Sequence, residues 1–249
     1  ASGLAPDASR FVGESTEYDA NGRPVSGLPY RRTADGVAII SIVGTLVNRG
    51  AYIGASSGVV SYEGIKHQIA AVAADPKARA LILDIQSPGG EAIGAFEVAE
   101  AVRALAASKR VVAVVNGMAA SAAYAIASAA NEIVTTDTGV SGSIGVVLMH
   151  VDYSEWLKAE GVKPTLVFAG AHKVDGNPFE ALPEAVRADL QAVVNAFHDK
   201  FVRTVALGRG ARMNEAAIRA TEARTFIGEA AVKAGLADSV GTFESVLAD

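Results

Sequence analysis

The sequence of 249 residues contains no cysteine, which excludes a disulfide framework and thiolate chemistry. Histidine is also scarce, and no metal-site spacing connects the four that are present, His67, His150, His172 and His198. The glycine-rich stretch "SPGGEAIG" lacks the Gly-Lys-Ser/Thr of a phosphate-binding loop and the spacing of a dinucleotide site. We therefore expect no metal, nucleotide or organic cofactor.

An excess of positive charge and long hydrophobic runs are missing too. The formal net charge is -5 with both signs interleaved, so we expect no surface for nucleic acid or anionic lipid. No apolar run approaches the roughly 18 residues of a membrane span. The N-terminus also lacks the basic and apolar regions of a signal peptide. These absences predict a cytoplasmic protein without a membrane anchor.

The chain does contain short runs rich in Val, Ile and Leu that alternate with helical patterns. The runs, typical of strands buried on both faces, cover residues 36–46, 80–87, 110–117, 131–137, 144–152 and 164–170. Helical patterns cover residues 61–75, 92–108, about 120–130, 153–161 and 183–207. This alternation predicts an α/β fold with a mainly parallel sheet, flanking helices and a C-terminal helical segment. Residues 1–35, rich in Gly, Pro, Asp and Ser, are predicted to form an irregular arm before a single domain, 36–249.

Two adjacent glycines, Gly89 and Gly90, come after the predicted strand 80–87 in "DIQSPGG". Such a pair lets backbone N–H groups approach a ligand closely and can form an oxyanion pocket. A tight turn between a strand and a helix needs the same residues. The pair alone leaves both interpretations open.

Ser121 comes directly after a buried strand, at the start of the helical stretch "MAASAAYAIASAAN". A hydroxyl in that place would lie near the partial positive charge of a helix start and at the carboxyl edge of the sheet. The placement resembles that of a nucleophile elbow, although the GxSxG pattern is absent. The competing interpretation is a serine that only caps the helix.

A serine nucleophile needs a base, and the sequence offers several. His150 near Asp152 would give a conventional triad, and His172 is a second option. Lys173, in the loop "FAGAHKVDGNP", is a third, because a lysine becomes a base where burial lowers its pKa. Ser143, in "VSGSIGVV" at the head of the predicted strand 144–152, could orient an amine.

The order of these motifs carries a resemblance to a known family. "DIQSPGG", "GMAASAAYAIASAAN", "SGSIGV", "AGAHKVDGNP" and "TFIGEAAVKAGLADSVG" together resemble the signal peptide peptidase A family of serine-lysine peptidases. The resemblance runs from about residue 36 to the end and implies a fold similar to Clp protease and crotonase. Within the family, "HVDYSEWLKAEG" and "KVDGNPFEALPE" look most like the phage and prophage capsid assembly proteases.

The resemblance implies a role for each matching residue. Ser121 matches the nucleophile and Lys173 the general base, while Ser143 matches the serine that orients the lysine. Gly90, with Gly89 before it, matches the backbone donor of the oxyanion hole. In single-domain relatives neighbouring subunits share an active site, so a ring-like homo-oligomer is also implied.

The expected function is that of a serine endopeptidase in phage or prophage capsid maturation. Its partner would be a polypeptide substrate such as a capsid scaffold or portal-associated protein, met in the cytoplasm or within assembling proheads. The alternatives are a cellular peptidase that degrades signal peptides, a non-catalytic capsid-assembly component, and a crotonase-like acyl-CoA enzyme. The presence of both Ser121 and Lys173 disfavours the non-catalytic capsid-assembly component. The lack of a basic cluster for CoA phosphates disfavours the acyl-CoA enzyme.

Overall fold

The computed structural model describes residues 15–18, 24–50 and 58–249. Contacts between residues divide the chain into two compact units. The first comprises the residues up to Gly145 together with Lys200–Asp249, and the second is Val146–Asp199.

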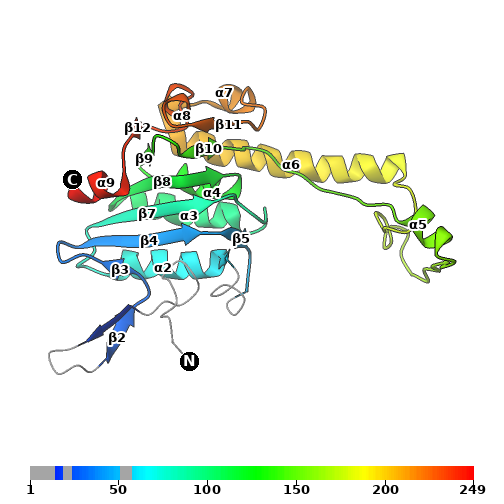
Figure 1. The fold of residues 1–249 in the computed structure, drawn as a ribbon, viewed down its shortest axis with the longest axis horizontal. Helices are drawn as coiled ribbons and strands as arrows, with labels where there is room; N and C mark the ends of the chain where they lie inside the picture. Colours follow the sequence, from blue (N-terminus) through cyan, green and yellow to red (C-terminus); the bar gives the residue numbers. More distant parts are fainter. Residues whose placement is uncertain (1–14, 19–23, 51–57) are drawn as a thin grey trace. The chain divides into compact units, whose positions relative to one another are not determined.

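The first unit is organised around an eight-stranded, mainly parallel sheet (Figure 1). Its strands run in the order β11, β10, β8, β7, β4, β3, with β9 pairing β8 and β12 pairing β9. Their bounds are β3 Arg31–Arg32, β4 Val37–Val43, β7 Ala80–Ser87, β8 Arg110–Ala120, β9 Glu132–Thr135, β10 Val140–Gly142, β11 Thr225–Ile227 and β12 Ser239–Val240. Within this sheet only β3 and β11 are antiparallel to their neighbours. The predicted α/β fold with a mainly parallel sheet is confirmed.

The helices are those that the apolar periodicity predicts, with short additions near the C-terminus. Their bounds are α2 Tyr62–Ala74, α3 Ala95–Ala106, α4 Ala122–Ala127, α5 Ser154–Ala159, α6 Glu184–Arg209, α7 Glu215–Arg219, α8 Glu229–Lys233 and α9 Phe243–Ala248. α5 lies in the second unit, and α6 begins in the second unit and ends in the first. No helix in the described part of the chain is both long enough and apolar enough to cross a membrane.

The central strands are buried on both faces, as their near-continuous Val, Ile and Leu content predicts. On one face Leu81, Leu83 and Ile85 of β7 are fully buried. On the other face Ile82 packs with valines of β8 and β9 and with apolar side chains of α9. The sheet is thus a rigid platform for the loops that leave its carboxyl edge.

Strand β8 changes partner partway along its length. It pairs with β9 through Val115 and with β10 from Met118 onward, and its register with β7 shifts between these two residues. Asn116 and Gly117 are the extra residues, and Gly117 has a positive φ of 120°. Such a bulge bends a strand and redirects the end of it, which here leads into Ser121.

Three expectations about strands need correction. Residues 144–152 and 164–170, predicted as buried strands, have no regular strand structure, and their side chains are largely exposed. Ser143 therefore comes after the short strand β10 and does not head a strand. The N-terminal arm is not irregular throughout, because β1 (Ser15–Tyr18) pairs with β2 (Pro24–Leu28). Apolar runs predict that a segment will be covered, but a strand also needs a neighbouring strand to pair with.

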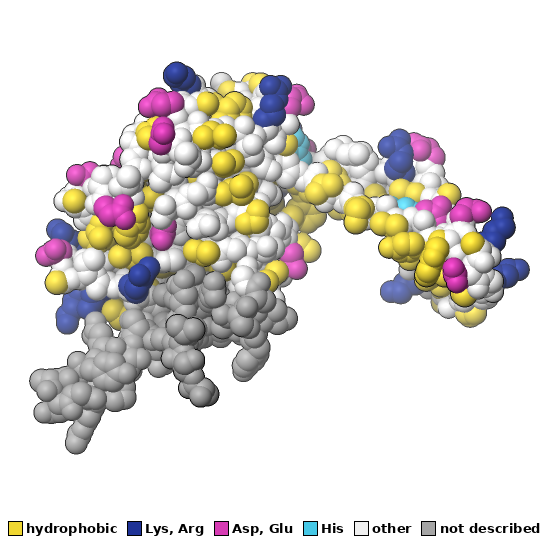
Figure 2. All heavy atoms as spheres, in the orientation of Figure 1, with side chains coloured by type: hydrophobic (Ala, Val, Ile, Leu, Met, Phe, Trp, Pro, Cys, Tyr) yellow, Lys and Arg dark blue, Asp and Glu magenta, His cyan; other side chains and the backbone are white. Residues whose placement is uncertain are grey.

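The second unit has a different character from the first. None of its residues is buried, and Val147 and Val167 are 90% and 95% exposed. Figure 2 shows exposed hydrophobic side chains along this unit, interspersed with charged ones. Within it, the Tyr153 N–H donates to the Pro178 carbonyl at 2.8 Å, and His150 Nε2 lies 3.0 Å from the Asn177 carbonyl oxygen.

Candidate active site

Ser121 lies in a sharp turn between β8 and α4. Its backbone has φ 52° and ψ -127°, a left-handed conformation that residues other than glycine rarely adopt. The turn is held by the Ser121 N–H, which donates to the Gly142 carbonyl at 2.9 Å, and by its carbonyl, which accepts from the Tyr124 N–H at 2.9 Å. Strained serines on turns from a strand to a helix are the geometry of nucleophile elbows. The predicted placement of Ser121 at this edge is confirmed.

The Ser121 hydroxyl is half-buried and makes no hydrogen bond to any residue that the structure describes. A serine that merely capped α4 would accept a hydrogen bond from an N–H of its first turn. No such bond is formed here. The capping interpretation is therefore the weaker of the two.

Gly89 packs directly against this turn. A Cβ atom at Gly89 would lie 2.6 Å from the Cβ of Ser121 and 2.9 Å from the Ala122 nitrogen. Gly89 also has a positive φ of 98°, so a side chain there would be both strained and crowded. The glycine pair predicted from the sequence and the candidate nucleophile thus meet in one place.

Two backbone N–H groups border this place without a hydrogen-bond partner among the described residues. One belongs to Gly90 and the other to Ala122, the first residue of α4. Free N–H groups beside a nucleophile are what an oxyanion hole requires. Gly90 is predicted from the sequence motif, whereas Ala122 is not. A general signal could have found it, because the first residues of any helix have N–H groups without an intrahelical acceptor.

Ser143 is the third predicted residue that the structure brings to this edge. It comes directly after Gly142, which pairs with Ala120 and accepts the Ser121 N–H. Ser143 itself has φ 56°, and its N–H donates to the Arg224 carbonyl at 3.0 Å. Its half-buried hydroxyl, like that of Ser121, has no hydrogen-bond partner in the described part of the chain.

Lys173 lies in the other unit, Val146–Asp199, so the structure does not place it against Ser121. It is exposed and occupies a turn in which its N–H donates to the Gly170 carbonyl at 3.1 Å. The pairing of Lys173 with Ser121 stays a prediction.

The histidine alternatives also lie in the second unit. His150 Nε2 is 3.0 Å from the Asn177 carbonyl oxygen. The Asp152 carboxylate accepts from the Ser154 N–H at 2.8 Å, and its hydrogen bonds with Ser154 lower its pKa. Asp152 is thus engaged at the start of α5. His172 is exposed and pairs with Asp175 at 2.8 Å, which raises the His172 pKa.

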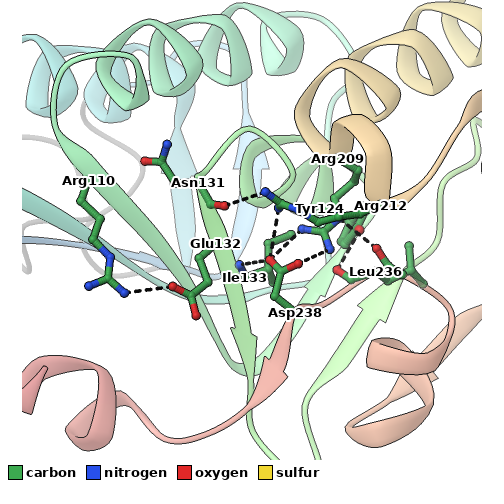
Figure 3. A network of polar contacts seen from close by, with 10 residues as sticks. Arg110, Tyr124, Asn131, Glu132, Ile133, Arg209, Arg212, Leu236 and Asp238 are labelled. Atoms are coloured by element: carbon green, nitrogen blue, oxygen red, sulfur yellow. Dashed lines mark hydrogen bonds and ion pairs between the residues drawn. The ribbon is translucent and has the colours of Figure 1, made fainter.

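Behind α4, a polar network fixes the helix that comes after the candidate nucleophile (Figure 3). The fully buried Tyr124 donates its hydroxyl to the Leu236 carbonyl at 2.9 Å. Two residues further on, Asp238 binds the buried Arg209 guanidinium through both oxygens, at 2.7 and 2.9 Å, and accepts from the Ile133 N–H. Burial opposes the charge on Asp238, but the hydrogen bonds from Arg209 and Ile133 outweigh it and lower the Asp238 pKa. The network ties α4 to the C-terminal end of α6.

Acidic side chains and histidines do not gather into a group of three that could hold a metal ion within residues 15–18, 24–50 and 58–249. The groups that the structure brings to this edge of the sheet are a serine hydroxyl and backbone N–H donors. That combination suits acyl transfer.

Comparison with known families identifies the class. The model of Peptidase family S49 matches residues 103–249, more than half of the chain, and that of Clp protease matches residues 35–134. The chain belongs to peptidase family S49, with a Clp protease-like fold. The resemblance to the signal peptide peptidase A family is thereby confirmed.

The similar proteins include phage proteins, as the motifs "HVDYSEWLKAEG" and "KVDGNPFEALPE" indicated. The chain is 41% identical over 234 residues to the head-tail preconnector protein GP5 of Enterobacteria phage P21, covering 94% of this chain and 46% of that one. It is 37% identical over 206 residues to the capsid assembly protease C of Escherichia phage lambda, covering 83% and 46%. A putative signal peptide peptidase SppA of Enterococcus faecium is 29% identical over 217 residues, covering 84% and 60%. The chain thus spans about half the length of the two phage relatives.

Proposed function

We propose that this chain is a serine endopeptidase in which Ser121 is the nucleophile and Lys173 the general base. The main support for the proposal is the strained turn at Ser121, which packs against Gly89 and whose hydroxyl has no hydrogen-bond partner among the described residues. Membership of a peptidase family supports the reaction class, and the geometry of this turn supports Ser121 as the nucleophile.

The reaction can be written from the roles of these groups. Neutral Lys173 takes the proton from the Ser121 hydroxyl as its oxygen attacks the substrate carbonyl carbon. The carbonyl oxygen becomes an oxyanion that accepts hydrogen bonds from the Gly90 and Ala122 N–H groups. The departing amine takes the proton from Lys173, which leaves an acyl-enzyme on Ser121. A water molecule, deprotonated by Lys173, then releases the acyl group, and Ser143 holds the lysine amine in place.

We propose further that the active chain is a ring-like homo-oligomer with shared active sites. In support, Lys173 lies in a unit that has no core of its own and leaves Val147, Val167 and Trp156 exposed. Hydrophobic surface of this kind marks association in soluble proteins. On this proposal residues 36–249 still act as one peptidase domain, because the site draws on both units.

The proposed substrate is a polypeptide of an assembling capsid, such as a scaffold or portal-associated protein inside the prohead. Support comes from the names of the two phage relatives, a capsid assembly protease and a head-tail preconnector protein. An extended polypeptide could add as a strand beside the loops at the sheet edge, which is a common mode of peptide recognition.

The test is cleavage of an unfolded protein by the wild type and by Ser121→Ala, with the products mapped by mass spectrometry. A matched control is Ser128→Ala, because Ser128 is fully buried on the same helical segment and donates to the Ala125 carbonyl at 2.8 Å. We expect the wild type and Ser128→Ala to cut and Ser121→Ala to be inactive. Folded, oligomeric wild type that cuts nothing would favour the non-catalytic assembly component.

Sharing of the site is tested by mixing two inactive proteins. Ser121→Ala and Lys173→Ala subunits, exchanged into mixed oligomers, should recover part of the activity, since some sites then receive an intact serine and an intact lysine. Mixed oligomers that remain as inactive as their parents would show that each chain completes its own site.

A further inference from the structure

In the loop Ser87–Glu91, between β7 and α3, one backbone N–H lacks an acceptor among the described residues. Pro88 has no N–H, and the N–H groups of Gly89 and Glu91 both have acceptors. The N–H of Gly90 has none among the residues described. The loop is therefore held on both sides of the Gly90 N–H, which is the loop's contribution to the proposed mechanism.

Ser87 holds the side that precedes Gly90. Its side chain is fully buried, and its hydroxyl donates to the Gly44 carbonyl at 2.6 Å and accepts from the Gly89 N–H at 3.1 Å. Gly44 is itself fixed, because its N–H donates to the Gln86 carbonyl at 3.0 Å. One hydroxyl thus ties the start of the glycine turn to the end of β4.

The backbone of Leu46 fixes the Gly89–Gly90 peptide group, which contains the Gly90 N–H. Its N–H donates to the Gly89 carbonyl at 2.8 Å. That carbonyl and the Gly90 N–H belong to the same planar trans peptide, so they point in opposite directions. A hydrogen bond that fixes the carbonyl therefore also fixes the direction in which the Gly90 N–H points.

Tyr62 holds the other side of Gly90. The Glu91 N–H donates to the Leu46 carbonyl at 2.9 Å, and the Glu91 carbonyl accepts from the Tyr62 hydroxyl at 2.5 Å. Tyr62 is fully buried at the start of α2. Burial, with a smaller contribution from the Glu91 charge, raises the Tyr62 pKa, so its hydroxyl stays a donor.

We propose that Ser87 and Tyr62 are positioning residues that aim the Gly90 N–H at the oxyanion of the transition state. Two adjacent glycines can adopt many conformations, and an oxyanion donor is effective only when its direction is set before the reaction. The two hydroxyls, with the backbone of Leu46 between them, restrict the peptides around Gly90 to one arrangement. The inference rests on the proposed function, because it assumes that Gly90 serves Ser121.

The test variants are Tyr62→Phe and Ser87→Ala, each of which removes one of these hydroxyls. We expect kcat to fall about 10-fold in each with KM unchanged, because a misaimed donor weakens only the transition state. A peptide aldehyde ending at a mapped cleavage site should bind each variant more weakly by a similar factor, since its adduct with Ser121 places an oxygen in the oxyanion hole.

Matched controls separate aiming from general loss of a buried hydrogen bond. Tyr30→Phe removes a fully buried phenol that donates to Asp75 at 2.6 Å, at the opposite end of α2. That end lies roughly 20 Å away along the helix. Ser128→Ala removes a fully buried hydroxyl and is the control for Ser87→Ala. Both controls should keep the wild-type kcat and aldehyde affinity.

The outcomes distinguish this inference from the function on which it rests. A wild type that cleaves no better than Ser121→Ala would overturn the proposed function. If the wild type is active but folded Tyr62→Phe keeps its kcat within about twofold, the positioning role is wrong. Equal losses in the controls and the test variants would likewise overturn it. Should Ser87→Ala fail to fold, Tyr62→Phe alone decides the outcome.

Discussion

The unit that contains Ser121 and the unit that contains Lys173 differ in how far their hydrophobic side chains are buried. In the first, Leu83, Val114 and Ile126 are fully buried. In the second, Val146–Asp199, no residue is buried although its sequence contains many Val, Leu and Phe residues. The first unit can be stable through its own packing, whereas the second needs contacts from outside itself. In the proposed dyad, Ser121 is therefore positioned by the packing of its own unit, whereas Lys173 depends on contacts from outside its unit.

Substitution of Lys173 is expected to cause the greatest loss of activity. Lys173→Met should reduce kcat/KM at least about 10³-fold, because the base is lost while the oxyanion donors remain. The free energy of unfolding of the first unit should not change, because Lys173 is exposed in the other unit. Steady-state kinetics and urea denaturation measure the two quantities.

Lys158→Met is the matched control for this prediction. Lys158 is also exposed in the second unit and makes a 3.6 Å ion pair with Glu155 on the surface of α5. It should retain activity. A Lys173→Met protein that keeps more than a tenth of the wild-type rate would remove Lys173 from the mechanism.

The next largest effect concerns the core of the first unit. Leu83 lies on β7 between Ile40 of β4 and Ala113 of β8 and is fully buried. Leu83→Ala should lower the free energy of unfolding by about 2–5 kcal/mol, from lost apolar contact and the cavity left behind. Urea denaturation monitored by circular dichroism would measure it. Leu207→Ala, at a position 69% exposed on α6, should leave stability nearly unchanged; equal losses at both would contradict the assigned core.

A smaller effect is expected where the network of Figure 3 joins α4 to α6. Asp238→Asn should lower the free energy of unfolding by about 2 kcal/mol at pH 7, because the buried Arg209 then loses its charged partner. The Glu132→Gln variant is the control, since Glu132 pairs with Arg110 at the surface. It should cost less than about 0.5 kcal/mol.

The effect of Asp238→Asn on the free energy of unfolding should depend on pH. The Asp238 pKa is lower in the folded chain than in the unfolded one, so its carboxylate stabilises the fold above the unfolded value of about 3.9. That stabilisation is lost as the pH falls from about 3.9 toward the folded pKa. The difference in unfolding free energy between wild type and Asp238→Asn should therefore shrink on acidification. A difference that grows below pH 4 would show that the Asp238 pKa is raised by folding.

The same contrast explains which features the sequence could predict. The runs 80–87 and 110–117 became β7 and most of β8, because each pairs with a parallel strand along most of its length. The equally apolar runs 144–152 and 164–170 did not become strands, because hydrophobicity alone does not supply a strand to pair with.

At the candidate site, the sequence correctly placed Ser121 between a strand and a helix and the glycine pair after a strand, but it placed Ser143 at the head of a strand that does not form. It could not reveal the strained backbone of Ser121. Nor could it show the bond from Tyr124 to Leu236, residues 112 positions apart. Contacts of that length depend on the packing of the whole fold and leave no local pattern.

The smallest effect on stability is expected at Val167, which is 95% exposed in the second unit. Val167→Ser should change the free energy of unfolding of the single chain by no more than about 0.5 kcal/mol, as exposed positions usually do. In a shared-site oligomer the same change removes apolar contact between subunits, so assembly and activity should fall together at low protein concentration. Sedimentation velocity across a dilution series, with activity measured on the same samples, tests this. If assembly and activity stay at wild-type levels at every concentration, Val167 is not buried by another subunit.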